Sequence, residues 1–253
     1  MAGRRSFEEL LDEAAAVAVE GWDFSWFCGR ATEERPPWGY AGILADRLAG
    51  TSTALDIQTG GGELLAAVPR LPTLLVATES WSPNVAIAHR TLAPRGAWVV
   101  HTDEDADLPF ASASFDLVVS RHPVVTHWPE IARLLRPGGT YLSQQVGAGS
   151  MRELTDALMG PQPVGQRRRG AGAVASAIAA GLDVVDFREA TLPAVFDDIA
   201  AVVVFLRTVV WTVPDFTVDR YRRPLHELHD RMEREGPFVA HAERFLIEAQ
   251  KPL

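Results

Sequence analysis

A run of three glycines, Gly60 to Gly62, is the part of the sequence best suited to binding a small ligand. It follows Ala54–Ile57, an apolar run interrupted by Asp56, and precedes a helix-forming stretch that begins at Glu63. This order predicts a buried strand that turns sharply into a helix. Because glycine has no Cβ, it allows positive φ and lets a ligand approach the main-chain amides. We therefore expect a ligand site at this turn.

Polar residues also follow two other predicted strands. Glu79 comes directly after the apolar run 73–78, and the residues Ser120, Arg121 and His122 close a later strand. Ligands of open parallel sheets bind at the carboxyl ends of the strands. Because imidazole titrates near neutral pH, His122 is a candidate general base, and Arg121 is a candidate for holding an anionic or carbonyl group. An ordinary loop with a hydrogen-bonded histidine is an equally good interpretation.

Strands and helices alternate along the middle of the chain. Such alternation predicts an α/β fold, namely a Rossmann-like, doubly wound, mostly parallel sheet with helices on both faces. Seven strands are expected, together with an N-terminal helical and aromatic arm and a helical insertion between the last two strands. The expected strands are 54–57, 73–78, 97–101, 115–120, 140–145, 184–192 and 238–248, and the insertion spans about 196–235.

A single domain of 253 residues is expected, because no internal repeat or linker divides the chain. Residues 1–50 are expected to form an N-terminal arm or lid, 51–147 a ligand-binding core, and 148–253 a C-terminal part that contains the insertion. Aromatic and charged residues alternate between Gly21 and Tyr40. This composition fits either a lid over a pocket or an arm that plugs the core.

The charge and the cysteine content disfavour several classes of protein. A net charge of −9 disfavours broad binding to nucleic acid or to anionic membranes. Cys28 is the only cysteine, so an intrachain disulfide and a thiolate cluster are excluded, and no spacing of histidines and carboxylates indicates a metal. No apolar run reaches the ~20 residues of a membrane span, and no apolar signal core follows the N-terminus. A cytoplasmic location is expected.

Four landmarks follow one another at characteristic spacings. They are the turn 56–62, Glu79, the Leu-Pro-Phe and Ser-Phe-Asp motifs within 108–118, and the Leu-Arg-Pro-Gly-Gly motif at 135–139. Together they resemble the class I S-adenosylmethionine-dependent methyltransferases, in particular the methyltransferase type 11-like group, and the resemblance covers roughly 54–146. A dinucleotide-dependent oxidoreductase is the competing interpretation, but the three glycines lack its Gly-x-Gly-x-x-Gly spacing.

The resemblance implies S-adenosyl-L-methionine as the cofactor. It places the glycine turn against the methionine portion of the cofactor and Glu79 on the two ribose hydroxyls. Trp81 is expected to cover the adenine, unless it is a surface residue that caps the next helix, and either Glu104 or Asp105 is expected at the adenine amino group. The expected cofactor-binding residues are Asp56, Gln58, Thr59, Gly60, Gly61, Gly62, Glu79, Ser80, Trp81, Glu104, Asp105 and Ser120.

Gln58 departs from the family pattern, which usually has glycine at this position. A side chain there either narrows the carboxylate end of the cofactor site or supplies an amide contact. The departure keeps open the hypothesis of a non-catalytic cofactor-binding protein.

The function that the resemblance implies is in-line methyl transfer, and a small organic molecule is the expected acceptor. The aromatic arm and the insertion are expected to form walls of the acceptor pocket, although core packing explains the insertion aromatics equally well. An RNA methyltransferase is the alternative, in which Arg167–Arg169 and Arg220–Arg223 contact phosphates instead of forming a solvated face. The expected substrate-binding residues are Trp22, Trp26, Arg30, Trp38 and Trp211.

Overall fold

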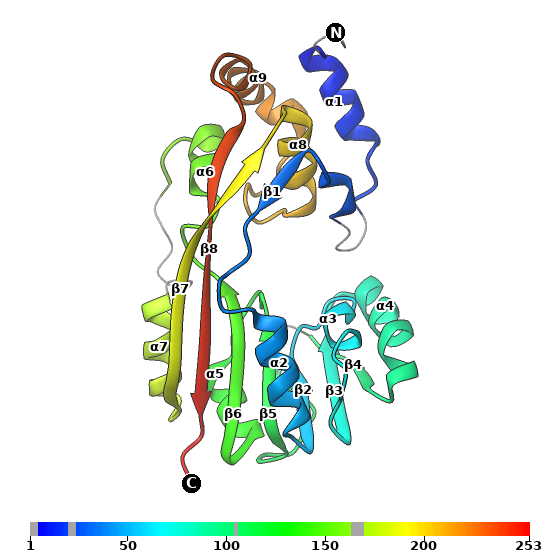
Figure 1. Ribbon diagram of the computed structural model, residues 1–253, viewed down its shortest axis with the longest axis vertical. Coiled ribbons are helices and arrows are strands. Elements are labelled where there is room, and N and C mark those ends of the chain that lie inside the picture. The colour runs from blue at the N-terminus through cyan, green and yellow to red at the C-terminus, as the bar shows by residue number, and fades with distance from the viewer. Residues whose placement is uncertain (1–4, 20–23, 104–105, 163–169) are drawn as a thin grey trace. The chain divides into compact units, whose positions relative to one another are not determined.

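The computed structural model describes residues 5–19, 24–103, 106–162 and 170–253 (Figure 1). The chain divides into two compact units, and each of them is assembled from three segments. The core unit comprises Pro36–Ala148, the described part of Gly165–Ala190, and Arg244–Leu253. The helical unit comprises the described parts of Met1–Arg35 and Gly149–Val164, and Thr191–Glu243.

The described residues form an eight-stranded sheet with the strand order β1-β7-β8-β6-β5-β2-β3-β4. The neighbours from β6 to β4 in this order are parallel, whereas β8 pairs antiparallel with β6 and β1 pairs antiparallel with β7. The predicted Rossmann-like, mostly parallel α/β fold is confirmed. The strands are β1 (Ala31–Glu33), β2 (Thr53–Asp56), β3 (Leu74–Glu79), β4 (Trp98–His101), β5 (Phe115–Arg121), β6 (Leu135–Val146), β7 (Asp183–Phe196) and β8 (Phe238–Gln250).

The predicted number of strands was one too small, because β1 lies in the arm that we expected to be irregular. In β1, Ala31 lies opposite Phe196 and Glu33 lies opposite Ala194, at the end of β7. A strand of three residues is too short to show a hydrophobic alternation. Its existence depends on pairing with a distant segment, which no local pattern reports.

Helices cover both faces of the sheet in the core unit. Because successive strand residues point to opposite faces, Ala54 and Leu55 of β2 belong to two different apolar clusters. Leu55 packs in the cluster that contains Ile131 of α5 and Ala177 of α7, and Ala54 packs in the cluster that contains Leu44 of α2. The helices are α1 (Phe7–Ala16), α2 (Tyr40–Ala49), α3 (Glu63–Ala66), α4 (Ser82–Leu92), α5 (Trp128–Leu134), α6 (Arg152–Met159), α7 (Gly170–Ala179), α8 (Ile199–Thr208) and α9 (Val218–Glu235).

The helical insertion between β7 and β8 was predicted correctly, and it consists of α8 and α9. Thr217 caps α9, since its side chain accepts a hydrogen bond from the Arg220 amide. Within the described ranges, no helix has the length and the apolar character that crossing a bilayer requires.

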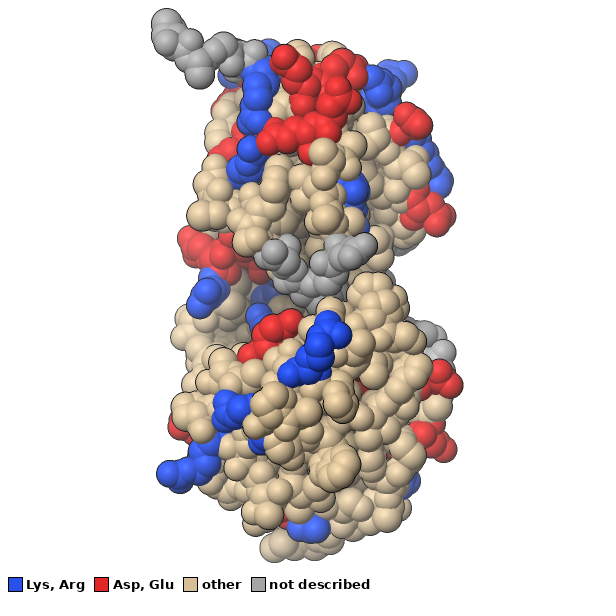
Figure 2. Space-filling model, turned by 90° about the vertical axis from the view of Figure 1, so that its right-hand side faces the viewer, with Lys and Arg blue, Asp and Glu red and all other residues tan. Residues whose placement is uncertain are grey.

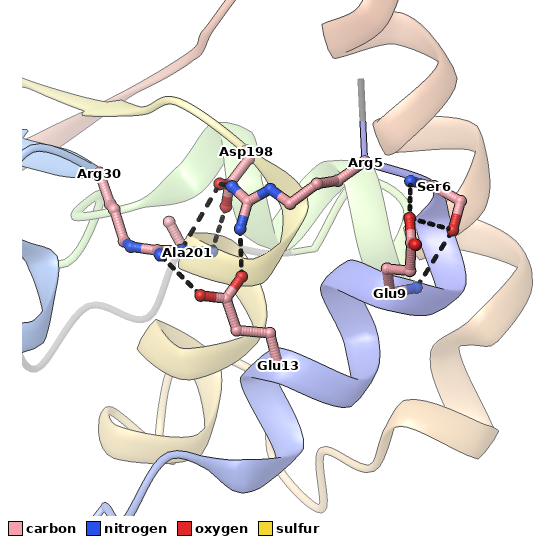
Figure 3. A network of polar contacts seen from close by, with 7 residues as sticks. All are labelled: Arg5, Ser6, Glu9, Glu13, Arg30, Asp198 and Ala201. Atoms are coloured by element: carbon pink, nitrogen blue, oxygen red, sulfur yellow. Dashed lines mark hydrogen bonds and ion pairs between the residues drawn. The ribbon is translucent and has the colours of Figure 1, made fainter. Parts of the chain in front are cut away.

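An ion-pair network fixes α1 in the helical unit (Figure 3). Glu13 of α1 accepts a hydrogen bond of 2.6 Å from Arg30, and it also pairs with Arg5. Asp198, the N-cap of α8, pairs with Arg5 at 2.8 Å and with Arg30 at 3.8 Å. The Arg30 guanidinium also lies over the Trp26 ring, 4.5 Å from its centroid. Arg30 and Trp26 therefore hold the local structure of the helical unit.

Two of the sequence landmarks are structural. Asp116 of the Ser-Phe-Asp motif accepts hydrogen bonds from the Thr53 amide at 3.0 Å and the Thr53 hydroxyl at 2.8 Å, and from Arg136 at 2.7 Å. Arg133 donates to the Phe110 carbonyl at 2.8 Å and the Leu108 carbonyl at 3.1 Å. These bonds tie the Leu-Pro-Phe segment to α5 and the start of β2 to β5.

Replacing Asp116 with alanine is expected to destabilise the protein, because Thr53 and Arg136 lose their shared acceptor. Loss of hydrogen bonds to a charged group costs about 1–3 kcal/mol. Urea denaturation should show a correspondingly lower midpoint for Asp116→Ala. Asp183→Ala, which removes an exposed carboxylate at the start of β7, is the control and should change the free energy of unfolding by less than about 0.5 kcal/mol. Equal midpoints for the two variants would contradict the structural role of Asp116.

Candidate functional site

A pocket opens at the carboxyl ends of the parallel strands in the core unit. The space is partly open to solvent. The residues that line it lie at or after the ends of β2, β3, β4 and β5, and others come from α5 and β6. Of the expected cofactor-binding residues, the lining includes Gln58, Glu79, Ser80 and Ser120. The edge of the sheet predicted from the sequence is therefore the edge that carries the pocket.

The glycine turn between β2 and α3 has the sharp geometry expected of it. The backbone angle φ is +60° at Gln58, +65° at Gly60 and +80° at Gly62. A Cβ on Gly62 would lie only 2.8 Å from the side chain of Leu92, so this position requires glycine for its packing as well as for its backbone angle. The helix that follows, α3, is a single turn.

Glu79 ends β3, and its carboxylate is buried and fixed by backbone amides. One oxygen accepts a hydrogen bond of 2.7 Å from the Gly60 amide, and the other accepts bonds of 3.0 Å from the amides of Ser80 and Trp81. A carboxylate has about four lone-pair sites, so capacity remains for a ligand hydroxyl. Because Glu79 also lines the pocket, it is a preorganised acceptor for a polar ligand.

Asp56, at the end of β2, is a second buried carboxyl below the turn. Its burial, together with the nearby charge of Glu79, raises its pKa to about 7. At and below that pH a large fraction of the Asp56 carboxyl is therefore protonated. Of the two adjacent acids, Glu79 is the one provided with hydrogen-bond donors from the main chain.

The side chain of Gln58 crosses from the glycine turn to the loop that follows β5. Its amide nitrogen donates to the Val125 carbonyl at 2.8 Å, and its amide oxygen accepts from the Val124 amide at 2.6 Å. The glutamine at this position, where the family pattern usually has glycine, is therefore held by two hydrogen bonds to the main chain of the loop.

Ser120, Tyr141 and Ser143 form a buried polar cluster at the base of the pocket. The Ser120 hydroxyl lies 2.7 Å from the Tyr141 hydroxyl and 2.9 Å from the Ser143 hydroxyl. The Ser120 carbonyl accepts a bond of 3.0 Å from the Tyr40 hydroxyl. Burial raises the pKa of Tyr141, so this group is a neutral hydroxyl facing the pocket.

A chain of hydrogen bonds fixes the state of His122. The indole N–H of Trp38 donates to Gln144 Oε1 at 2.9 Å, so the other end of that amide, Nε2, is a donor. Gln144 Nε2 lies 3.0 Å from His122 Nε2, which must therefore accept and carries no proton. Burial, and after it the charges of Arg121 and Arg244, lower the pKa of His122 to about 3.

The remaining predicted residues lie in several places. Asp56, Thr59 and Gly60 to Gly62 form the turn beside the pocket, and the Thr59 amide donates to the Thr78 carbonyl at 2.9 Å. Trp81 is the N-cap residue of α4 and is 51% exposed, and Arg121 is exposed at the end of β5. Trp26, Arg30 and Trp211 belong to the helical unit, whereas Trp38 belongs to the core unit. Glu104, Asp105 and Trp22 lie outside the described residues.

Several residues of the pocket were not among the predicted ones. They include Ile131 of α5 and Tyr141 of β6. Asp103, which follows β4 and also lines the pocket, belongs to the acidic run that contains Glu104 and Asp105. For Ile131 and Tyr141 no local signal exists, because their orientation depends on the packing of α5 and β6. Among the described residues, no group of His, Cys, Asp and Glu side chains has a geometry that could hold a metal ion.

Known proteins resemble this chain in sequence and in structure. Residues 55–143 match the family model described as a methyltransferase domain. A candidate methyltransferase from Bacillus halodurans is 16% identical with a TM-score of 0.60, and the similarity covers 84% of this chain and 99% of that one. The YcgJ protein of Bacillus subtilis is 17% identical with a TM-score of 0.62, covering 85% of this chain and 98% of its own. A Deinococcus radiodurans protein of unknown function is 16% identical with a TM-score of 0.56, covering 88% and 91%.

These structural likenesses concern the fold, since the identities are low. No protein with a curated description matches the sequence.

The raised pKa of Asp56 predicts a loss of stability as the pH rises. Its pKa is about 7 in the folded protein and 3.8 without the fold, so between these values the folded state holds a proton that the unfolded state has released. The free energy of unfolding should therefore fall by roughly 1–4 kcal/mol between pH 4 and pH 7. Asp56→Asn removes this contribution. Urea denaturation at pH 5 and pH 8 should show a smaller fall for the variant, and an equal fall would contradict the assignment.

The lowered pKa of His122 predicts a loss of stability as the pH falls. The pKa is about 3 in the folded protein and 6.5 without the fold, so the stability is fully present above 6.5 and is lost as the pH falls toward 3. Between pH 7 and pH 4.5, the free energy of unfolding should fall by about 2 kcal/mol less in His122→Asn than in the wild type. Asparagine tolerates the φ of +55° at this position. The exposed His89→Asn is the control, and an NMR titration of His122 with a pKa near 6 would refute the prediction.

Proposed function

We propose that the protein is an S-adenosyl-L-methionine-dependent methyltransferase that acts on a small organic molecule, because residues 55–143 match the family model of a methyltransferase domain. The cofactor binds in the pocket at the carboxyl ends of β2 to β5. When bound, it supplies a methyl group carried on a sulfonium cation.

The observation that carries this proposal is the Glu79 carboxylate. It is buried, it lines the pocket, and three backbone amides hold it in one orientation. A ribose presents two adjacent hydroxyl donors, and the oxygen that accepts only from Gly60 has capacity for such a donor. The fit of the chain to the cofactor therefore rests on an acceptor that is already in place.

The remaining lining residues suit the other parts of the cofactor. The apolar side chains of Ile57, Leu108 and Ile131 line the pocket and provide flat contacts for a purine ring. Asp103, at the end of β4, provides an acceptor for an amino group. In this proposal Asp103 takes the place that we expected for Glu104 or Asp105.

The chain's contribution to methyl transfer is mainly alignment of the acceptor. In this arrangement His122 is a weak base, because its pKa is about 3 and its Nε2 lone pair is engaged by Gln144. We assign His122 a positioning role at the end of β5. Where the acceptor must lose a proton, His127 is the candidate base, since it lines the pocket. Arg121 remains the candidate for holding an anionic part of the acceptor.

A small-molecule acceptor is favoured over RNA by the pairing of the arginines on α9. Arg222 pairs with Glu8 at 2.5 Å, and Arg223 pairs with Glu227 at 2.8 Å. In each of the two units, on the face shown in Figure 2, basic residues lie beside acidic ones. RNA binding needs several unpaired cations on one face. The second basic run, Arg167–Arg169, lies outside the described residues.

The proposal is tested by titrating the protein with S-adenosylmethionine and S-adenosylhomocysteine by calorimetry. Glu79→Ala is expected to weaken binding about 10- to 100-fold, because hydrogen bonds to a charged group contribute about 1.5–3 kcal/mol. Thermal denaturation should verify that the variant is folded, and Asp183→Ala should bind like the wild type. If the wild-type protein binds neither ligand, the function proposed here is wrong and the non-catalytic alternative fails with it.

A further inference from the structure

We propose that Gln58 is a positioning residue, which fixes the segment Pro123–Thr126 as one wall of the pocket and thereby raises the affinity for the cofactor. The second part of this inference rests on the proposed function. The first part concerns the protein without any ligand.

The contact between Gln58 and this segment is reciprocal and specific for an amide. The Val124 N–H can only donate and the Val125 carbonyl can only accept, so the orientation of the Gln58 amide is determined. The two distances are 2.6 Å and 2.8 Å. A carboxylate at this position would lose one of the bonds, and an apolar side chain would lose them both.

The middle of the segment has little other support. The side chains of Val124 and Val125 are 46% and 36% exposed, so burial of apolar surface does little to hold them. The ends are anchored separately: the His122 amide donates to the Gln144 carbonyl at 2.7 Å, and the Thr126 hydroxyl donates to Gln145 at 3.4 Å. Gln58 therefore supports the part of the loop that neither anchor reaches.

The backbone of Gln58 is consistent with selection for its side chain. Its φ of +60° lies in the left-handed region, where glycine is favoured and glutamine is strained. This strain is offset by the two hydrogen bonds that the Gln58 side chain forms with the loop. A glycine would relieve the strain but would leave the loop unsupported.

The geometry favours support of the pocket wall over obstruction of the pocket. Both ends of the Gln58 amide are bonded to the main chain of the loop, so the side chain is engaged in the lining of the pocket. Pro123, Val125 and Thr126 line this space together with Gln58 itself. A loop that is ordered before binding does not have to be ordered by the ligand, and this raises affinity.

Hydrogen exchange of the Val124 amide tests the positioning role in the free protein. Exchange in Gln58→Ala and Gln58→Gly should be at least about tenfold faster than in the wild type, because the amide loses its acceptor. Gln58→Glu keeps an acceptor for the Val124 amide, so its exchange rate should lie between that of the wild type and those of the other two variants. Gln250→Ala, which removes a side-chain amide that bonds to the Gly138 carbonyl, is the matched control and should leave Val124 unchanged. Equal exchange in the wild type and in Gln58→Gly would overturn the proposal.

Binding of S-adenosylhomocysteine tests the coupling to the cofactor. Gln58→Ala and Gln58→Gly should bind it roughly 3- to 10-fold more weakly than the wild type. Equal or tighter binding by Gln58→Gly would instead identify the side chain as an obstruction and refute the inference. If the wild-type protein binds no ligand, the proposed function fails and the coupling fails with it, whereas the exchange measurement still decides the positioning role.

Discussion

The hydrogen bond between the Glu79 carboxylate and the Gly60 amide joins the two loops on which the pocket depends. The Thr59 amide adds a second link between them, since it donates to the Thr78 carbonyl at 2.9 Å. Burying a carboxylate without partners is strongly unfavourable, so the Gly60 amide stabilises the buried Glu79 and, with it, the contact between the end of β3 and the glycine turn. The packing of Gly62 against Leu92 then keeps the turn against α4.

Burial also decides which groups beside the pocket carry charge. It raises the pKa of Asp56 to about 7 and lowers that of His122 to about 3, so at neutral pH these groups contribute less charge than their types suggest. Glu130 is paired with Arg133 at 2.6 Å. Glu79 and Asp103 are thus the lining carboxylates without an arginine partner among the contacts described above. A pocket of this kind favours a cationic ligand, which agrees with the sulfonium cofactor of the proposed function.

The sequence predicted those features that depend on local order along the chain. The alternation of strands and helices was readable because each buried strand ends in a polar residue or a turn, as β2 ends at Asp56 and β3 ends at Glu79. The three-residue β1 was not readable, because its pairing partner in β7 is far away in the sequence. Likewise, His122 was a reasonable candidate base by position alone. Its hydrogen bond to Gln144, and that of Gln144 to Trp38, exist only in the folded protein.

The construction of each unit from three separate segments has a consequence for attempts to divide the protein. Strands β7 and β8 each contribute residues to the core unit and to the helical unit, so no single cut in the chain separates the two. A truncated gene would therefore encode an incomplete version of at least one unit. An isolated core would have to be made by rejoining three pieces of chain with new linkers. Removing the helical unit would require one cut within β7 and another within β8.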